Sequence, residues 1–203
     1  MNVLLLVDIQ NDFLFGGALQ VPAGDQVISV ANELMPLFSL VLATKDWHPA
    51  NHGSFASQHP GKRPGEFITL HGLQQILWPD HCVQHSPGAE FAPGLNVAGI
   101  HDVVTKGTDA MIDSYSGFFD NGGRNATELD ARLRAHGVDK IFIMGLATDY
   151  CVKFTALDAI GLGYRVHIVE PGCRGVDVQP GDVTRALDEM RQAGVRVVGR
   201  DLK

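Results

Sequence analysis

Short apolar runs recur along the chain and alternate with segments of helical periodicity. Ile141 to Met144 is one such run. A continuous apolar run is typical of a strand that is covered on both faces of a sheet. Strands of this kind are predicted at residues 3–7, 40–44, 102–105, 141–146, 165–169 and 195–198.

Helical patterns separate these strands. Apolar residues recur at helical spacing within residues 25–38, and Thr127 with Asp130 resembles a capping box for a helix that ends at Gly137. A last helix is expected between residues 183 and 194. The alternation predicts an α/β fold: a doubly wound, mostly parallel six-stranded sheet with helices on both faces and right-handed crossovers.

Residues 47–100 differ from the rest of the chain. They hold six of the nine histidines and most of the prolines, and they show little periodicity. A segment of this length without regular structure inside a compact domain is usually functional. We expect residues 1–203 to form a single domain, with this region lying over the sheet edge to which the strands point.

Charge and cysteine content restrict the partners and the compartment. The net charge of -7 argues against nucleic acid or an anionic membrane as the main partner. Cys82, Cys151 and Cys173 are odd in number and widely spaced, as expected of free thiols in a reducing compartment. The apolar run Val3 to Val7 is too short for a signal peptide or a membrane span. A cytoplasmic protein is expected, and its oligomeric state, a homo-oligomer included, is left open.

A polar residue follows each of the first four predicted strands: Asp8, Asp46, Lys106 and Cys151. The exits of parallel strands share one edge of an open sheet, where ligands bind. Each residue alone has an ordinary interpretation as a turn, a cap or a surface charge. Together they predict one crevice that contains two carboxylates, an amine and a thiol.

Cys151 is the predicted nucleophile of this crevice. Thr148 and Asp149 are of the type that caps helices, so a helix is expected to begin near Tyr150. Cys151 would then lie in the first turn, where free N–H groups and the helix dipole favour a thiolate. An inert core cysteine is the alternative.

Asp8 and Lys106 complete a set of groups suited to attack on a carbonyl. Lys106 is expected to lower the pKa of the Cys151 thiol, and Asp8 could deliver a proton to a leaving group and remove one from water. A covalent thioester follows from this chemistry. The backbone N–H of Cys151 and one from the turn Leu146–Ala147 are the expected oxyanion donors.

A second group of residues predicts a metal site. Asp46 and His48 are two positions apart, so they point to one side of an extended segment, and His81 could bring a third ligand from the long region. His52 and Ser54 are candidates for a further contact. Carboxylate and imidazole ligands suit Zn²⁺, Mn²⁺ or Fe²⁺.

Several segments, taken in order, resemble the nicotinamidases of the isochorismatase-like cysteine hydrolases. They are VDIQNDF (7–13), TKDWHPANHGSF (44–55), WPDHCVQ (78–84), TKG (105–107), DSYSGFFDN (113–121), GLATDYCVKFTALDA (145–159) and GCRGV (172–176). The resemblance covers nearly the whole chain and implies the fold already predicted. It also implies hydrolysis of nicotinamide to nicotinate and ammonia in NAD salvage, with pyrazinamide as a further substrate.

The resemblance assigns roles to single residues. It implies a catalytic triad of Asp8, Lys106 and Cys151. It implies one divalent metal ion, with Zn²⁺ expected ahead of Mn²⁺ and Fe²⁺, on Asp46, His48 and His81, while Ser54 lies where some relatives supply a further contact. It places Phe13 and Trp78 as walls for the pyridine ring and Tyr115 near the rim. The peptide Leu146–Ala147 corresponds to one that is cis in the family, with the Ala147 N–H in the oxyanion hole.

Other functions fit the sequence less well. The aromatic pair and the D-W-H metal motif of this chain argue against an amidase for N-carbamoyl compounds, and isochorismatases do not rely on the cysteine. A thiol–disulfide protein is disfavoured because no second cysteine lies close to Cys151 in sequence. A non-catalytic pyridine- or metal-binding module would bind nicotinamide without turnover.

Overall fold

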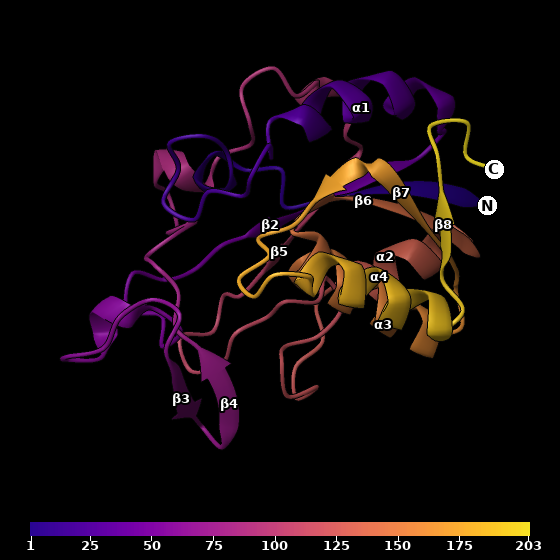
Figure 1. Ribbon diagram of the computed structural model, residues 1–203. Coiled ribbons are helices and arrows are strands. Elements are labelled where there is room, and N and C mark those ends of the chain that lie inside the picture. Colours follow the sequence, from indigo (N-terminus) through magenta and orange to yellow (C-terminus); the bar gives the residue numbers. More distant parts are fainter.

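A six-stranded parallel sheet forms the middle layer of the protein, for which the computed structural model describes residues 1–203. The strand order is β5-β2-β1-β6-β7-β8 (Figure 1). The strands are β1 (Asn2–Val7), β2 (Val41–Asp46), β5 (Asp102–Lys106), β6 (Lys140–Leu146), β7 (Arg165–Arg174) and β8 (Arg196–Val198). The predicted fold class is confirmed. β7 extends beyond the predicted end at Val169 because its pairing with β6 resumes after an irregularity at Ile143 to Gly145.

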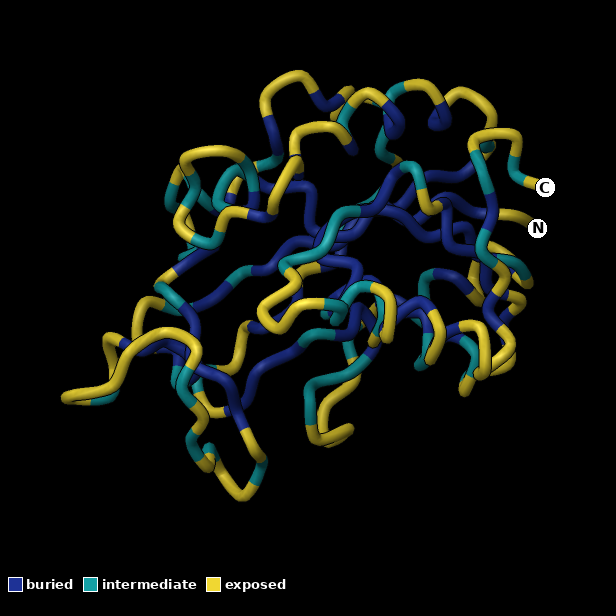
Figure 2. Tube along the Cα trace, in the orientation of Figure 1, coloured by how far each residue is buried: buried dark blue, intermediate teal, exposed yellow.

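The apolar runs lie in the core because helices cover both faces of the sheet. Residues Val3 to Val7 and Val41 to Ala43 are all buried, and Figure 2 shows the central strands as continuously buried chain. α1 (Gln26–Leu34) lies on one face, and α2 (Leu129–Ala135), α3 (Lys153–Gly161) and α4 (Asp182–Gln192) lie on the other (Figure 1). None of the helices combines the length and apolarity that crossing a bilayer requires.

Two helix ends differ from the prediction. α1 ends at Leu34, and a 3-10 turn, Met35–Leu37, replaces its expected last turn because Pro36 has no N–H to continue the helix. At the start of α2, the Leu129 N–H donates to the Thr127 hydroxyl, but the Asp130 carboxylate accepts from Arg134 and Tyr164. The capping box is therefore only half formed.

The chain reverses its direction of travel across the sheet between β1 and β6. From β1 it proceeds outward through β2 to β5, and then returns to place β6, β7 and β8 on the other side of β1. This reversal is a topological switch point, where the loops after the two neighbouring strands diverge and leave a crevice. The residues that follow β1 and β6 therefore face the same opening.

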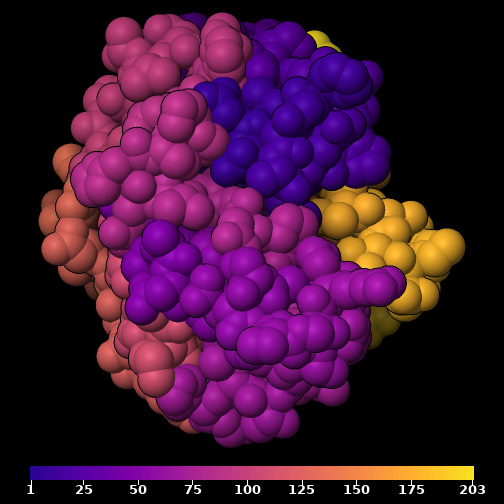
Figure 3. Space-filling view, turned by 90° about the vertical axis from the view of Figure 1, so that its left-hand side faces the viewer, coloured from indigo at the N-terminus to yellow at the C-terminus, as the bar shows by residue number.

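The region 47–100 covers the edge to which the strands point (Figure 3). Contrary to the prediction, it contains regular structure, an antiparallel hairpin of β3 (Phe67–Leu70) and β4 (Leu73–Ile76). His71 and Gly72 form its turn with φ values of 47° and 87°, as a tight turn between twisted strands requires. A hairpin this short carries too few residues for its alternation to stand out in the sequence.

Candidate active site

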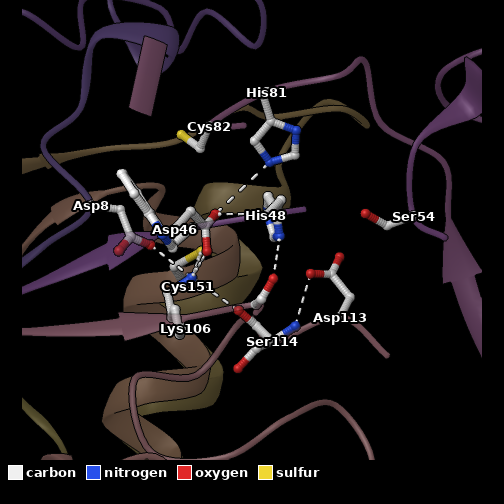
Figure 4. A network of polar contacts seen from close by, with 12 residues as sticks. Asp8, Asp46, His48, Ser54, His81, Cys82, Lys106, Asp113, Ser114 and Cys151 are labelled. Carbon is white, nitrogen blue, oxygen red and sulfur yellow. Dashed lines mark hydrogen bonds and ion pairs between the residues drawn. The ribbon is translucent and has the colours of Figure 1, made fainter. Parts of the chain in front are cut away.

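The exits of four strands bring Asp8, Asp46, Lys106 and Cys151 together, as the sequence predicts (Figure 4). Asp46 and Lys106 are the last residues of β2 and β5 and are paired across the sheet. Asp8 follows β1, and Cys151 follows β6. All four residues are buried, so their charges interact with little screening by water.

The Asp8 carboxylate is held in place by its own backbone and by a hydroxyl. Asp8 has a φ of 50°, a conformation that aspartate tolerates better than most residues, and it turns the chain out of β1. The Thr44 hydroxyl donates to Asp8 Oδ1 at 2.6 Å. Thr44 was not predicted to lie at the site, although a polar residue inside a buried strand is a usable signal.

Lys106 contacts every other charged or nucleophilic group of the site. Its Nζ lies 2.9 Å from Asp8 Oδ2 and 3.4 Å from Cys151 Sγ. It also forms an ion pair with Asp46 and donates to the Ser114 carbonyl at 2.9 Å. Although burial lowers the pKa of Lys106, the carboxylates of Asp46 and Asp8 outweigh it and raise that pKa well above the usual range. The ammonium is therefore a permanent charge.

Cys151 lies in a π-helical turn, Thr148–Val152, that leads directly into α3. The predicted position at the start of a helix is confirmed, but the predicted capping by Asp149 is not. The Asp149 carboxylate instead accepts from the N–H groups of Val176 and Asp177, at 3.0 and 2.8 Å, and so fixes the loop after β7.

Lys106 lowers the pKa of the Cys151 thiol as predicted, but the overall shift is upward, contrary to the expectation of a thiolate. Burial raises the pKa of the Cys151 thiol well above its usual range, and Lys106, although it lowers the pKa, only partly offsets this. The neighbouring carboxylates Asp8 and Asp46 add to the rise. The resting group is therefore a thiol, and it needs a base to take its proton.

Asp8 is placed to be that base. One of its carboxylate oxygens lies within 4.8 Å of Cys151 Sγ. Burial raises the pKa of Asp8, against the lowering effect of Lys106. A carboxylate with a raised pKa is a stronger base toward a thiol than an ordinary aspartate is.

The turn between β6 and Cys151 presents a free backbone donor. The peptide Leu146–Ala147 is cis, as the resemblance implies. Ala147 is buried and borders the same cavity as Cys151. The Ala147 N–H has no acceptor within the protein, so it can donate to a bound oxygen.

Asp46, His48 and His81 converge on one point beside the triad. Asp46 Oδ2 lies 3.5 Å from His48 Nε2 and 3.8 Å from His81 Nε2 (Figure 4). The donor atoms of the three residues all lie within 4.8 Å of one another. Asp46 and His81 also line the cavity that Cys151 borders. Two imidazoles and one carboxylate beside a cavity are the donor set of a catalytic rather than a structural metal site.

The second nitrogens of both histidines support this assignment. His48 Nδ1 lies 2.8 Å from the Gly107 carbonyl, and His81 Nδ1 lies 2.8 Å from the Pro79 carbonyl. A carbonyl only accepts, so both Nδ1 atoms carry hydrogen and both Nε2 atoms are left to face Asp46. Burial lowers the pKa of His81 to about 4, which keeps it neutral as ligation requires. Burial also acts to lower the pKa of His48, but the Asp46 carboxylate outweighs it and raises that pKa, so a bound cation would displace a proton from His48. The residues present therefore fit a divalent cation.

Gly107 is needed for this contact. Its φ is 65°, and a Cβ at this position would lie 2.4 Å from His48 Cε1. A side chain would therefore push the imidazole away from the carbonyl that orients it.

The two candidates for a further ligand pair with each other. The Ser54 hydroxyl lies 2.7 Å from His52 Nδ1, and Figure 4 shows Ser54 set apart from Asp46. The His52 ring packs against His48 with 4.3 Å between the centroids. His52 therefore packs against His48 and helps to hold its imidazole in place. Ser54 is not brought to the three predicted ligands.

Aromatic side chains border the cavity above the sulfur. Phe13, Trp78 and Tyr115 all line it, as the resemblance implies. The Trp78 indole N–H donates to the Tyr115 hydroxyl at 3.2 Å, which fixes the plane of the indole. Leu19, Tyr150, Val176 and Asp113 also line the cavity and were missed, because nothing in their spacing distinguishes them from ordinary loop or core residues.

Asp12 joins the two sides of this cavity. Its Oδ2 accepts from the Cys82 N–H at 2.7 Å, and it precedes Phe13 directly in the chain. This hydrogen bond fixes the loop that carries Phe13 against the loop that carries His81, although the two loops are far apart in sequence.

Comparisons with known proteins agree with this site. The isochorismatase domain family matches residues 2–201. The nicotinamidase of Escherichia coli is 55% identical over 197 residues, which cover 95% of this chain and 92% of that protein.

Solved structures extend the agreement to the fold. The nicotinamidase and pyrazinamidase of Acinetobacter baumanii superposes with a TM-score of 0.95 at 42% identity, covering 98% of this chain and 96% of that one. The pyrazinamidase of Pyrococcus horikoshii, solved in complex with zinc, gives a TM-score of 0.77 at 38% identity and covers 98% of both chains. The chain belongs to the isochorismatase family and, within it, to the nicotinamidases.

Proposed function

We propose that the protein hydrolyses the carboxamide of nicotinamide to nicotinate and ammonia, a step of NAD salvage, through a thioester on Cys151. The position of Lys106 carries this proposal, because one ammonium contacts the nucleophile, the acid–base carboxylate and a metal-ligand carboxylate. Family membership supports the substrate class. Pyrazinamide differs from nicotinamide by one ring atom and is proposed as a second substrate.

Attack begins with proton transfer from the thiol. Asp8 takes the proton as Cys151 sulfur bonds to the carboxamide carbon, and the carbonyl electrons move to oxygen. The backbone N–H groups of Ala147 and Cys151 donate to this oxyanion. The Ala147 N–H is available because it has no acceptor in the protein. Lys106 stabilises the thiolate as it forms, since its Nζ lies 3.4 Å from the sulfur.

The remaining steps restore the protonation state of the site, with a proton from water replacing the thiol proton that leaves in ammonia. The C–N bond breaks as Asp8 protonates the leaving nitrogen, which departs as ammonia and leaves the thioester. Asp8 then removes a proton from the attacking water, and that proton returns to sulfur as the C–S bond breaks. The Cys151 thiol is restored, and the carboxylic acid product passes its proton to solvent or ammonia and leaves as nicotinate.

Asp46, His48 and His81 would hold one divalent cation, which we propose to be Zn²⁺, with Mn²⁺ and Fe²⁺ as alternatives. A zinc-bound relative supports this order. When bound, the cation supplies a Lewis-acidic anchor for the pyridine nitrogen. Phe13 and Trp78 hold the ring by its faces, which keeps the carboxamide carbon near the sulfur and contributes to the rate by orientation.

Ammonia release from nicotinamide tests the proposed activity directly. The purified protein is expected to release ammonia, and a strong chelator should lower the rate at least about tenfold, with recovery on adding Zn²⁺. Tight binding of nicotinamide without ammonia release in the metal-loaded protein would show a binding module and not an enzyme.

The substitution His48→Ala tests the metal site separately. It removes one of three ligands, so we expect the metal content to fall and the dissociation constant for nicotinamide to rise about 10- to 100-fold. Cys151 should still react with iodoacetamide, because His48 does not contact the sulfur. Metal analysis of the purified variant is the measurement, and an unchanged metal content would mean that the ligands are assigned wrongly.

A further inference from the structure

A buried glutamine lies behind the Asp46 carboxylate. Gln10 is fully buried, and its carboxamide hydrogen-bonds to both the N–H and the carbonyl group of Asp46. The Asp46 N–H donates to Gln10 Oε1 at 2.8 Å, and Gln10 Nε2 donates to the Asp46 carbonyl at 2.8 Å. The same Nε2 donates to the Ala89 carbonyl at 2.9 Å, so both N–H groups of the amide are used.

Gln10 makes these hydrogen bonds at a residue of β2 that no longer has β1 as its neighbour. The register of β1 with β2 ends at Leu6 opposite Ala43, because the chain leaves β1 at Asp8. On its other side, β2 stays paired through Asp46 opposite Lys106. A side-chain amide has the donor and acceptor of a peptide group, so Gln10 replaces the missing strand for one residue.

We infer that Gln10 is a positioning residue for the metal site, acting through the backbone of Asp46. The inference rests on the proposed role of Asp46 as a ligand. With both backbone groups of Asp46 fixed, its Oδ2 is held between the Nε2 atoms of His48 and His81. The bond to Ala89 ties the same amide to the loop that follows His81, so the two ligand-bearing segments share one anchor.

The substitution Gln10→Met tests this inference because methionine has a similar length and no strong donor. Zinc affinity of the metal-free protein is measured by competition with a chromophoric chelator, and the apo protein is melted in parallel. We expect the dissociation constant for Zn²⁺ to rise about 10- to 100-fold in protein that is still folded at the assay temperature. Alkylation of Cys151 should stay at the wild-type rate.

Gln84→Met is the matched control. Gln84 Nε2 donates to the Trp47 carbonyl at 3.0 Å, one residue beyond Asp46, and the side chain is half-buried. This variant should bind Zn²⁺ as tightly as the wild type. If Gln10→Met is unfolded, Gln10→Asn, whose amide is one methylene shorter, takes its place in the same assay.

The outcomes separate the inference from the function on which it rests. Wild-type zinc affinity in folded Gln10→Met or Gln10→Asn would overturn the positioning role and leave the metal site intact. Unfolding of both variants would also overturn it, since Gln10 would then serve the fold as a whole. No zinc binding by the wild type would remove the metal site itself.

Discussion

Replacing Cys151 with alanine is expected to reduce ammonia release from nicotinamide by about 10⁴-fold or more. The substitution removes the sulfur that forms the thioester. Asp8 and Lys106 remain as a buried ion pair, but no thiol is present for Asp8 to deprotonate. The residual rate would come from water activated by Asp8 in the same cavity. A coupled ammonia assay at saturating nicotinamide measures the effect on kcat.

Cys173→Ala is the control for loss of a buried sulfur. Cys173 is also buried, and burial raises the pKa of its thiol to about 12, but the thiol donates to the Val169 carbonyl at 3.4 Å and not to a charged group. This variant should keep kcat within a few-fold of the wild type. Substantial ammonia release by Cys151→Ala, with nicotinamide binding intact, would rule out the thioester.

The fold and the convergence of the site follow from the sequence because parallel strands impose strict rules. A strand buried on both faces has to be apolar, so Val3 to Val7 and Ile141 to Leu146 are visible as runs. Polar residues are rare within such a strand and gather where it emerges from the core. Asp8, Asp46, Lys106 and Cys151 are therefore predictable as a group without knowledge of any contact between them.

Contacts between loops could not be predicted in the same way. Gln10 lies 36 residues before Asp46, and Asp149 lies 27 residues before Val176, so no local sequence spacing predicts either contact. The direction of the Cys151 pKa was missed for a related reason. Spacing places Lys106 beside the sulfur, but the depth of burial that outweighs this charge depends on how the whole chain packs.

Asp8→Asn is expected to affect turnover and thiol reactivity in opposite directions. Ammonia release should fall about 10³-fold, because the amide can neither take the thiol proton nor protonate the leaving nitrogen. Burial is the largest cause that raises the pKa of Cys151, and the Asp8 carboxylate raises it further. Removing that negative charge favours the thiolate, so the pKa of Cys151 should move down and alkylation by iodoacetamide at neutral pH should become faster.

The pH dependence of alkylation supplies the test, with the labelled cysteine identified by mass spectrometry because Cys82 and Cys173 are also free. Asp149→Asn is the control: this carboxylate is buried two residues before the sulfur but faces the Val176 loop, so the alkylation profile should not shift. A profile for Asp8→Asn that stays in place or moves to higher pH would mean that Asp8 does not act on the thiol. Near-normal turnover of Asp8→Asn would require another base. The other carboxylate close to both Lys106 and Cys151 belongs to Asp46, which is a proposed metal ligand.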